Sequence, residues 1–177
     1  MQIKLAMKET AIAANKLEYV PFTATNGLYS AVVPKPEYVE KIMRLAEELE
    51  LSPEEDALHA TVIYSKATPP DKSNIEEFTV FDREHTAIIN AVDSWVGHNG
   101  KTYIVLKLVS ESIVLENAKY QRMGAEHTFI PFAPHLTLSD EVPVDAAMKA
   151  RIAFVNKRLA FKPLEVVFTG QIAGDLT

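Results

Sequence analysis

The chain has 177 residues, of which 47% are hydrophobic and 24% are charged, with a formal net charge of -6 and no cysteine. This length and composition favour a single globular domain with a good core, and the lack of cysteine excludes disulfides and thiolate metal sites. The acidic balance argues against a surface that follows long nucleic acid, so any phosphate ligand is expected to be small and held in a local pocket.

The sequence also argues against a membrane protein. It has no run of about 18 apolar residues, which a transmembrane helix requires. The first residues, MQIKLAMKETAIAANK, are charged throughout and lack the apolar centre of a signal peptide. We therefore expect a cytoplasmic protein.

Hydrophobic periodicity and turn residues predict alternating strands and helices. In chain order, the expected elements are a short helix at 3–17, a strand at 27–33, a helix at 37–51, a strand at 58–65, a loop at 66–74, a short strand at 78–81, a hairpin of strands 85–96 and 101–109, a helix at 112–124 with Ser112 as its N-cap, a strand at 132–138, a helix at 143–160 and a strand at 164–169.

This order predicts an α+β fold with two related lobes. Each lobe is expected to be an antiparallel sheet backed by outer helices, with a central cleft between the lobes. We assign residues 26–177 to this single domain and residues 1–25 to an N-terminal extension.

One four-residue pattern occurs twice, as His59-Ala60-Thr61-Val62 and as His135-Leu136-Thr137-Leu138. Both copies lie in expected strands, where side chains two residues apart point to the same face. Two such strands side by side would gather two imidazoles and two hydroxyls around one small volume. A single copy is ordinarily a packed or surface histidine, but two copies in matching strand contexts indicate a shared site.

These groups suit cleavage of a phosphodiester without a metal. An imidazole has an ordinary pKa of about 6.5 and serves as acid or base near neutral pH, which is worth about 10²–10⁴ in rate. The threonine hydroxyls would donate to the non-bridging oxygens as negative charge grows there. The sequence does not decide which histidine is the acid. No spacing of histidines and carboxylates is typical of a zinc site, so no cofactor is expected.

Four further residues are candidates for substrate binding. Trp95, among small and polar neighbours, could stack on a base or lie in the core. Tyr29 lies in an apolar strand, where core packing is at least as reasonable. Lys66 could add positive charge near the phosphates or be a solvated surface lysine, and Glu165 could read a base edge or face solvent. Tyr64 is expected on the strand face opposite His59, if that strand is regular.

The paired motifs resemble those of the two-histidine (2H) phosphoesterase superfamily, whose members work without metal. Within it, the strings Asn26-Gly27-Leu28-Tyr29 and 58–65 (LHATVIYS), with Trp95 before a hairpin, are similar to the phage anti-CBASS phosphodiesterases. That resemblance implies a substrate among the cyclic di- and trinucleotides of bacterial antiviral signalling, base contacts from Tyr29 and Trp95, and action in the infected cell.

The function expected is therefore metal-independent cleavage of a small cyclic oligonucleotide. Three alternatives remain, of which the first keeps the same chemistry and the other two do not. The first is cleavage of another substrate, either an RNA-end 2′,3′-cyclic phosphate or a 2′,5′-linked oligoadenylate. The second is a sponge that binds cyclic nucleotides without cutting them. The third is a plain interaction domain. The intact histidines argue against this domain and against the sponge.

Overall fold

The computed structural model describes residues 27–67, 83–97 and 99–174. The expected helix at 3–17, the extension at 1–25 and the short strand at 78–81 lie outside these residues. The elements, in chain order, are β1 (Leu28–Pro34), α2 (Pro36–Glu48), the 3₁₀ turn η2 (Glu55–Ala57), β2 (Ala60–Ser65), β3 (His85–Val96), β4 (Thr102–Val109), α4 (Glu111–Arg122), β5 (His135–Asp140), α5 (Ala146–Phe161) and β6 (Leu164–Gly174).

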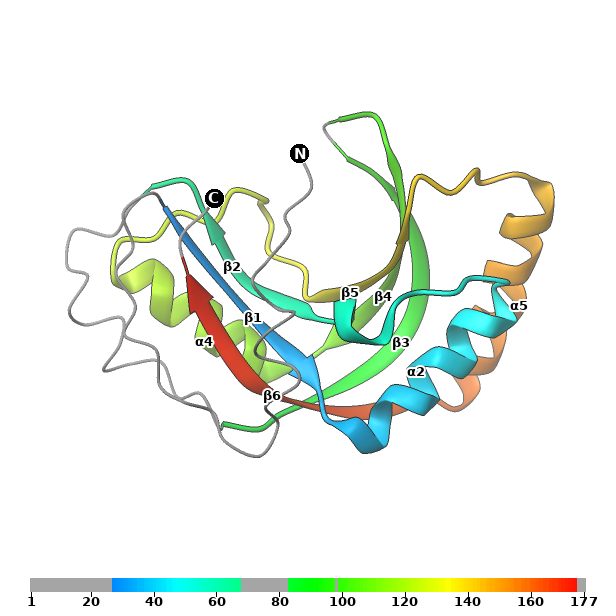
Figure 1. The fold of residues 1–177 in the computed structure, drawn as a ribbon, viewed down its shortest axis with the longest axis horizontal. Helices are drawn as coiled ribbons and strands as arrows, with labels where there is room; N and C mark the ends of the chain where they lie inside the picture. The colour runs from blue at the N-terminus through cyan, green and yellow to red at the C-terminus, as the bar shows by residue number, and fades with distance from the viewer. Residues whose placement is uncertain (1–26, 68–82, 98, 175–177) are drawn as a thin grey trace.

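The predicted α+β class is confirmed, and the described residues form six antiparallel strands and the three helices α2, α4 and α5. The helices pack on the outside of a strongly curved sheet, α4 at one end and α2 with α5 at the other (Figure 1). The core lies between the sheet and these helices and includes the fully buried side chains of Ile42, Ile113 and Phe168. None of the helices in the described part of the chain is long and apolar enough to cross a membrane.

The expectation of a separate sheet in each lobe is wrong. All six strands belong to one closed sheet in the order β1-β2-β5-β4-β3-β6. The reason is the length of β3, whose first half, from His85 to Ile89, pairs with β6 while the stretch from Ile88 to Val96 pairs with β4. One long strand therefore belongs to both halves, whereas the junction between β2 and β5 rests on the single pair Ala60 with Leu136.

Element ends differ from the predictions where local hydrogen bonds decide them. The N-cap of α4 is Ser110, two residues before the predicted Ser112, because the Ser110 hydroxyl accepts a hydrogen bond from Ile113 N at 3.4 Å. Helix α5 begins after Asp145, whose carboxylate accepts from Met148 N at 2.8 Å. Strand β6 runs five residues further than predicted because it continues to pair with β1 as far as Gly174.

Candidate functional site

The two motifs lie side by side on neighbouring antiparallel strands. Ala60 of β2 pairs with Leu136 of β5, and both side chains are fully buried. Continuing this register by one residue places Thr61 across from His135 and His59 across from Thr137. Because side chains alternate, these four residues face away from the core, and each is half-buried. Opposite positions in such a pair are about 4.5–5.5 Å apart between Cβ atoms, so the four groups share one small surface.

Both histidines are oriented by the same backbone contact. Nδ1 of His59 lies 2.8 Å from the carbonyl oxygen of Ala57, and Nδ1 of His135 lies 2.8 Å from that of Ala133. A carbonyl only accepts hydrogen bonds, so Nδ1 carries the proton in each ring and donates it. The unprotonated nitrogen of each neutral ring is therefore Nε2, which is the atom able to take a proton from a substrate.

Burial lowers the pKa of both histidines from its ordinary value. For His59, desolvation is opposed by the hydrogen bond to Ala57. For His135, desolvation is likewise the main cause, opposed by the bond to Ala133, and the charge of His59 lowers its pKa further. A proton on His59 therefore disfavours a proton on His135.

Each motif has a β-bulge at its fourth residue. In β2, Thr61 pairs with Ala31 and Ile63 with Ser30, so Val62 has no partner in β1. In β5, Thr137 pairs with Val105 and Ser139 with Ile104, so Leu138 has no partner in β4. A bulge adds one residue to a strand and reverses the side-chain alternation beyond it.

The bulge at Val62 corrects the expectation for Tyr64. Val62 and Ile63 are buried one after the other, and Tyr64 returns to the face of His59. The ring of Tyr64 lies 6.2 Å from that of Tyr29, centroid to centroid, and 5.6 Å from that of Phe129. An irregular strand therefore brings Tyr64 to the motif face, and the regular alternation assumed from the sequence could not have found it.

Tyr29 lies beneath the first motif. Its hydroxyl is 3.4 Å from Oγ1 of Thr61, and its ring is edge-on to that of His59 at 6.4 Å between centroids. Burial raises the pKa of Tyr29 to about 12, so its hydroxyl stays protonated at physiological pH. Only 6% of Tyr29 is exposed, and its hydroxyl faces Thr61, so its contact with a base stays a prediction.

Trp95 lies beside the second motif and is half-buried rather than a core residue. Its ring centroid is 4.5 Å from that of His135. The indole N–H donates to a carboxylate oxygen of Asp93 at 3.1 Å, and the same oxygen is 4.0 Å from Nζ of Lys107. Lys107 is itself the paired residue of His135 across β4 and β5.

Asp93, Lys107 and Phe129 are the residues of this surface that the sequence reasoning missed. A period-two pattern alone could have placed Asp93 on the face of Trp95, because they are two apart. Lys107 could not have been found without the register between β4 and β5.

The other two predicted residues, Lys66 and Glu165, are exposed. Lys66 follows directly after β2. Glu165 pairs with Ile88 of β3, which pairs with Val109 of β4. Val109 and Lys107 share a face, so Glu165 lies on the face of His135, separated from it by β3 and β4. The structure therefore gathers Tyr29, Trp95 and the four motif residues, and two strands lie between Glu165 and His135.

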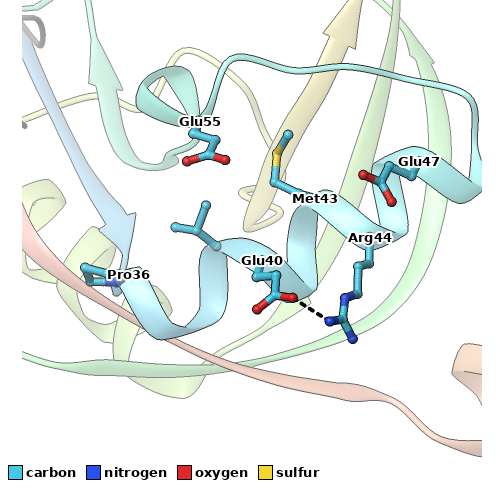
Figure 2. A pocket seen from close by; sticks show the side chains of 7 residues that line it. Pro36, Glu40, Met43, Arg44, Glu47 and Glu55 are labelled. Atoms are coloured by element: carbon cyan, nitrogen blue, oxygen red, sulfur yellow. Dashed lines mark hydrogen bonds and ion pairs between the residues drawn. The ribbon is translucent and has the colours of Figure 1, made fainter.

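A surface hollow of about 390 Å³ lies elsewhere, over α2 (Figure 2). Glu40, Glu47 and Glu55 line it, and Arg44, the cation among its described lining residues, is paired with Glu40. An anionic phosphate ligand would meet three carboxylates there, so this hollow does not compete with the motif face. Among the residues that the structure describes, no group of three or more histidine or acidic side chains is placed to hold a metal ion.

Comparison with known proteins gives a consistent match. The family model described as "Anti-CBASS protein Acb1" matches residues 26–167. Proteins named "Anti-CBASS protein Acb1" are similar to this chain in Vibrio phage KVP40, with 24% identity over 148 residues (82% of this chain and 92% of the relative), and in Yersinia phage phiR1-RT, with 29% identity over 124 residues (68% and 76%). The namesake in Enterobacteria phage T4 is 29% identical over 112 residues, covering 63% of this chain and 69% of the relative.

Proposed function

The chain belongs to the Acb1 family of anti-CBASS proteins, and from this we propose that it is a metal-independent phosphodiesterase that cleaves the 3′–5′ bonds of cyclic di- and trinucleotide immune signals. The observation that carries the proposal is the pairing of the two motifs. Two half-buried imidazoles, each with Nδ1 anchored to a carbonyl, share one face with two threonines. The protein would act in the cytoplasm of an infected bacterium, against its CBASS defence.

The chemistry follows from these groups. Nε2 of one neutral histidine takes the proton of the substrate's 2′-hydroxyl, and that oxygen attacks the adjacent phosphorus. The second histidine, protonated, gives its proton to the departing 5′-oxygen, so the P–O5′ bond breaks as the P–O2′ bond forms. The product is a linear oligonucleotide with a 2′,3′-cyclic phosphate. A 2′-hydroxyl already held near in-line distance supplies much of the rate.

The hydroxyls of Thr61 and Thr137 donate to the non-bridging oxygens, where negative charge grows in the transition state. Lys107, across from His135, adds positive charge on the same face. Trp95 is the surface on which a base stacks. Glu165 and Lys66 act as outer contacts to the bases or phosphates, and the two halves of the sheet that carry β2 and β5 form the walls of the substrate cleft.

The test is to incubate the purified protein with a panel of cyclic dinucleotides and trinucleotides in EDTA and to look for linear products. We expect cleavage at an undiminished rate. A rate that vanishes in EDTA and returns with Mn²⁺ or Zn²⁺ would assign the protein to a metal-dependent class. Tight binding without product would make it a sponge, and cleavage only of 2′,5′-oligoadenylate or of 2′,3′-cyclic phosphate ends would change the substrate.

The nucleophile has a test of its own. A cyclic dinucleotide that lacks the 2′-hydroxyl at the scissile bond should bind and resist cleavage. If the deoxy compound is cut at the normal rate, water is the nucleophile and the roles of the histidines must be reassigned.

A further inference from the structure

We infer that Tyr64 and Phe129 form a second nucleobase-stacking subsite, on the His59 side of the motif face and opposite Trp95. The inference rests on the proposed function, because it assigns one more base of a cyclic oligonucleotide to a place on the protein. Besides Trp95, the site would then have two further aromatic residues outside the motifs: Tyr64 from β2 and Phe129 from the loop before β5.

The first step is the direction of Tyr64. The bulge at Val62 turns Tyr64 toward the face that carries His59 and Thr61. Its ring rests edge-on against the buried ring of Tyr29, which is in turn edge-on to His59. Tyr29 therefore fills the space beneath, and Tyr64 is the half-exposed ring next to the site.

The second step is the exposure of Phe129. Its ring centroid lies 5.6 Å from that of Tyr64 at an interplanar angle of 50°, and 48% of the residue is exposed. The two rings make one aromatic surface, and about half of Phe129 is exposed to solvent. Aromatic faces of this kind, next to polar groups that contact phosphate, are typical of sites that bind nucleotide bases.

The third step is that the loop carrying Phe129 is fastened to Tyr64 itself. The carbonyl oxygen of Tyr64 accepts from Thr128 N at 2.8 Å, and Tyr64 N donates to Nδ1 of His127 at 3.3 Å. His127 is buried, and its ring packs against both Phe129 and Phe132. The two rings are thus held in position before any ligand arrives, which lowers the entropy lost on binding.

The last step is the geometry of the ligand. A cyclic dinucleotide has both phosphates in its central ring and its two bases at opposite ends of that ring. Phosphates at the four motif residues would send one base toward Trp95, beside His135, and the other toward the His59 side, where Tyr64 and Phe129 lie. Stacking tolerates every base because each has a π-face, so this pair of platforms predicts little base preference.

The inference is tested by equilibrium titration in a His135→Asn background, which we expect to keep the fold and to slow turnover by about 10² or more. The ligands are 3′,5′-cyclic diadenylate, with two bases, and adenosine 2′,3′-cyclic monophosphate, with one. Phe129→Ala and Tyr64→Leu are compared with two controls that also remove exposed apolar side chains: Ile130→Ala, from the same loop and 86% exposed, and Phe161→Ala, from α5 and 97% exposed.

Phe129→Ala is expected to raise the Kd of the cyclic dinucleotide by about 5-fold to 150-fold, the loss of one stacked base, and to leave the Kd of the monophosphate unchanged. Tyr64→Leu should behave in the same way, and Tyr64→Phe should restore binding, while both controls bind like the parent. An unchanged dinucleotide Kd in Phe129→Ala, or an equal loss for both ligands, would overturn the inference.

The wild-type enzyme separates this outcome from failure of the proposed function. If wild type cleaves cyclic dinucleotides and Phe129→Ala binds them normally, the subsite is wrong and the function stands. If wild type neither binds nor cleaves any cyclic oligonucleotide, the function and the subsite are both wrong.

Discussion

The two motif strands share the same local backbone geometry, but their neighbouring side chains differ. In both β2 and β5, Nδ1 of the histidine bonds to the carbonyl two residues earlier, the threonine is two residues later, and the fourth residue is at a bulge. In both, an aromatic ring lies edge-on to the imidazole, Tyr29 at His59 and Trp95 at His135.

The neighbours beyond this shared arrangement differ in chemical character. The described contacts on the His59 side are aromatic, with Tyr29, Tyr64 and Phe129 in one contact series. The His135 side has, besides Trp95, the charged residues Asp93 and Lys107. In the proposed function, the shared arrangement would supply the acid–base pair, and the different surroundings would hold and orient the ligand on it.

The largest effect should come from the shared arrangement. We expect His59→Asn and His135→Asn each to lower kcat by about 10² or more, because each removes one partner of the proton transfer. Asparagine can still donate to the carbonyl of Ala57 or Ala133, so circular dichroism and melting temperature should be nearly unchanged. Wild-type turnover in either variant would remove that histidine from the mechanism.

Removal of a threonine hydroxyl should lower kcat by less than removal of a histidine. Thr61 has in addition the hydroxyl of Tyr29 as a neighbour. Thr61→Val and Thr137→Val keep the side-chain shape and remove one donor each, and we expect a loss in kcat of about 10-fold to 10³-fold, with KM little changed. Tyr29→Phe removes the hydroxyl near Thr61, so it should lower kcat by less than Thr61→Val does. It should add nothing in the Thr61→Val background. An additive loss in that double variant would give Tyr29 a role independent of Thr61.

The variant Trp95→Ala tests whether this tryptophan binds the ligand or packs in the core. Trp95→Ala should weaken the binding free energy of a cyclic dinucleotide by about 1–3 kcal/mol. The melting temperature should be nearly unchanged, because the ring is half-buried. A core tryptophan would instead cost about 3–5 kcal/mol of stability when removed. A thermal melt beside a binding titration separates these outcomes, and a large loss of stability with normal affinity would return Trp95 to the core.

The smallest effect is a shift in pH dependence. Burial lowers the pKa of both histidines, so the singly protonated pair is most populated below their ordinary pKa of about 6.5. The profile of kcat/KM should be bell-shaped with its centre on that acidic side. A bound phosphate favours the imidazolium form, so the kcat profile should lie at higher pH than that of kcat/KM. A flat profile across this range would contradict an acid–base pair.

The sequence was sufficient for the parts of the site that depend on local pattern. The paired His-x-Thr motifs, their strands and the accessible Trp95 required only alternation and turn residues. A regular strand would put Tyr64 on the face opposite His59, but the bulge at Val62 depends on pairing with β1, which the sequence pattern does not carry. Lys107 was missed for the same kind of reason, since its position beside His135 exists only in the register of β4 with β5.

The closed sheet was also beyond the sequence pattern. Alternating strands and helices predicted the α+β class and the order of the elements. They did not predict that β3 pairs with both β4 and β6, because strand order is set by long-range contacts. The N-cap of α4 is Ser110 and not the predicted Ser112. Both serines carry a hydroxyl that can cap a helix, and the local turn geometry selects Ser110.

A double-mutant cycle on the two histidines tests the central claim most directly. Single-turnover rates on a cyclic dinucleotide, in EDTA, are compared for wild type, His59→Asn, His135→Asn and the double variant. If the imidazoles work as one acid–base pair, each single variant loses about 10² or more, and the double variant is scarcely slower than either. Losses that multiply in the double variant would mean that the two histidines act independently and would contradict the account.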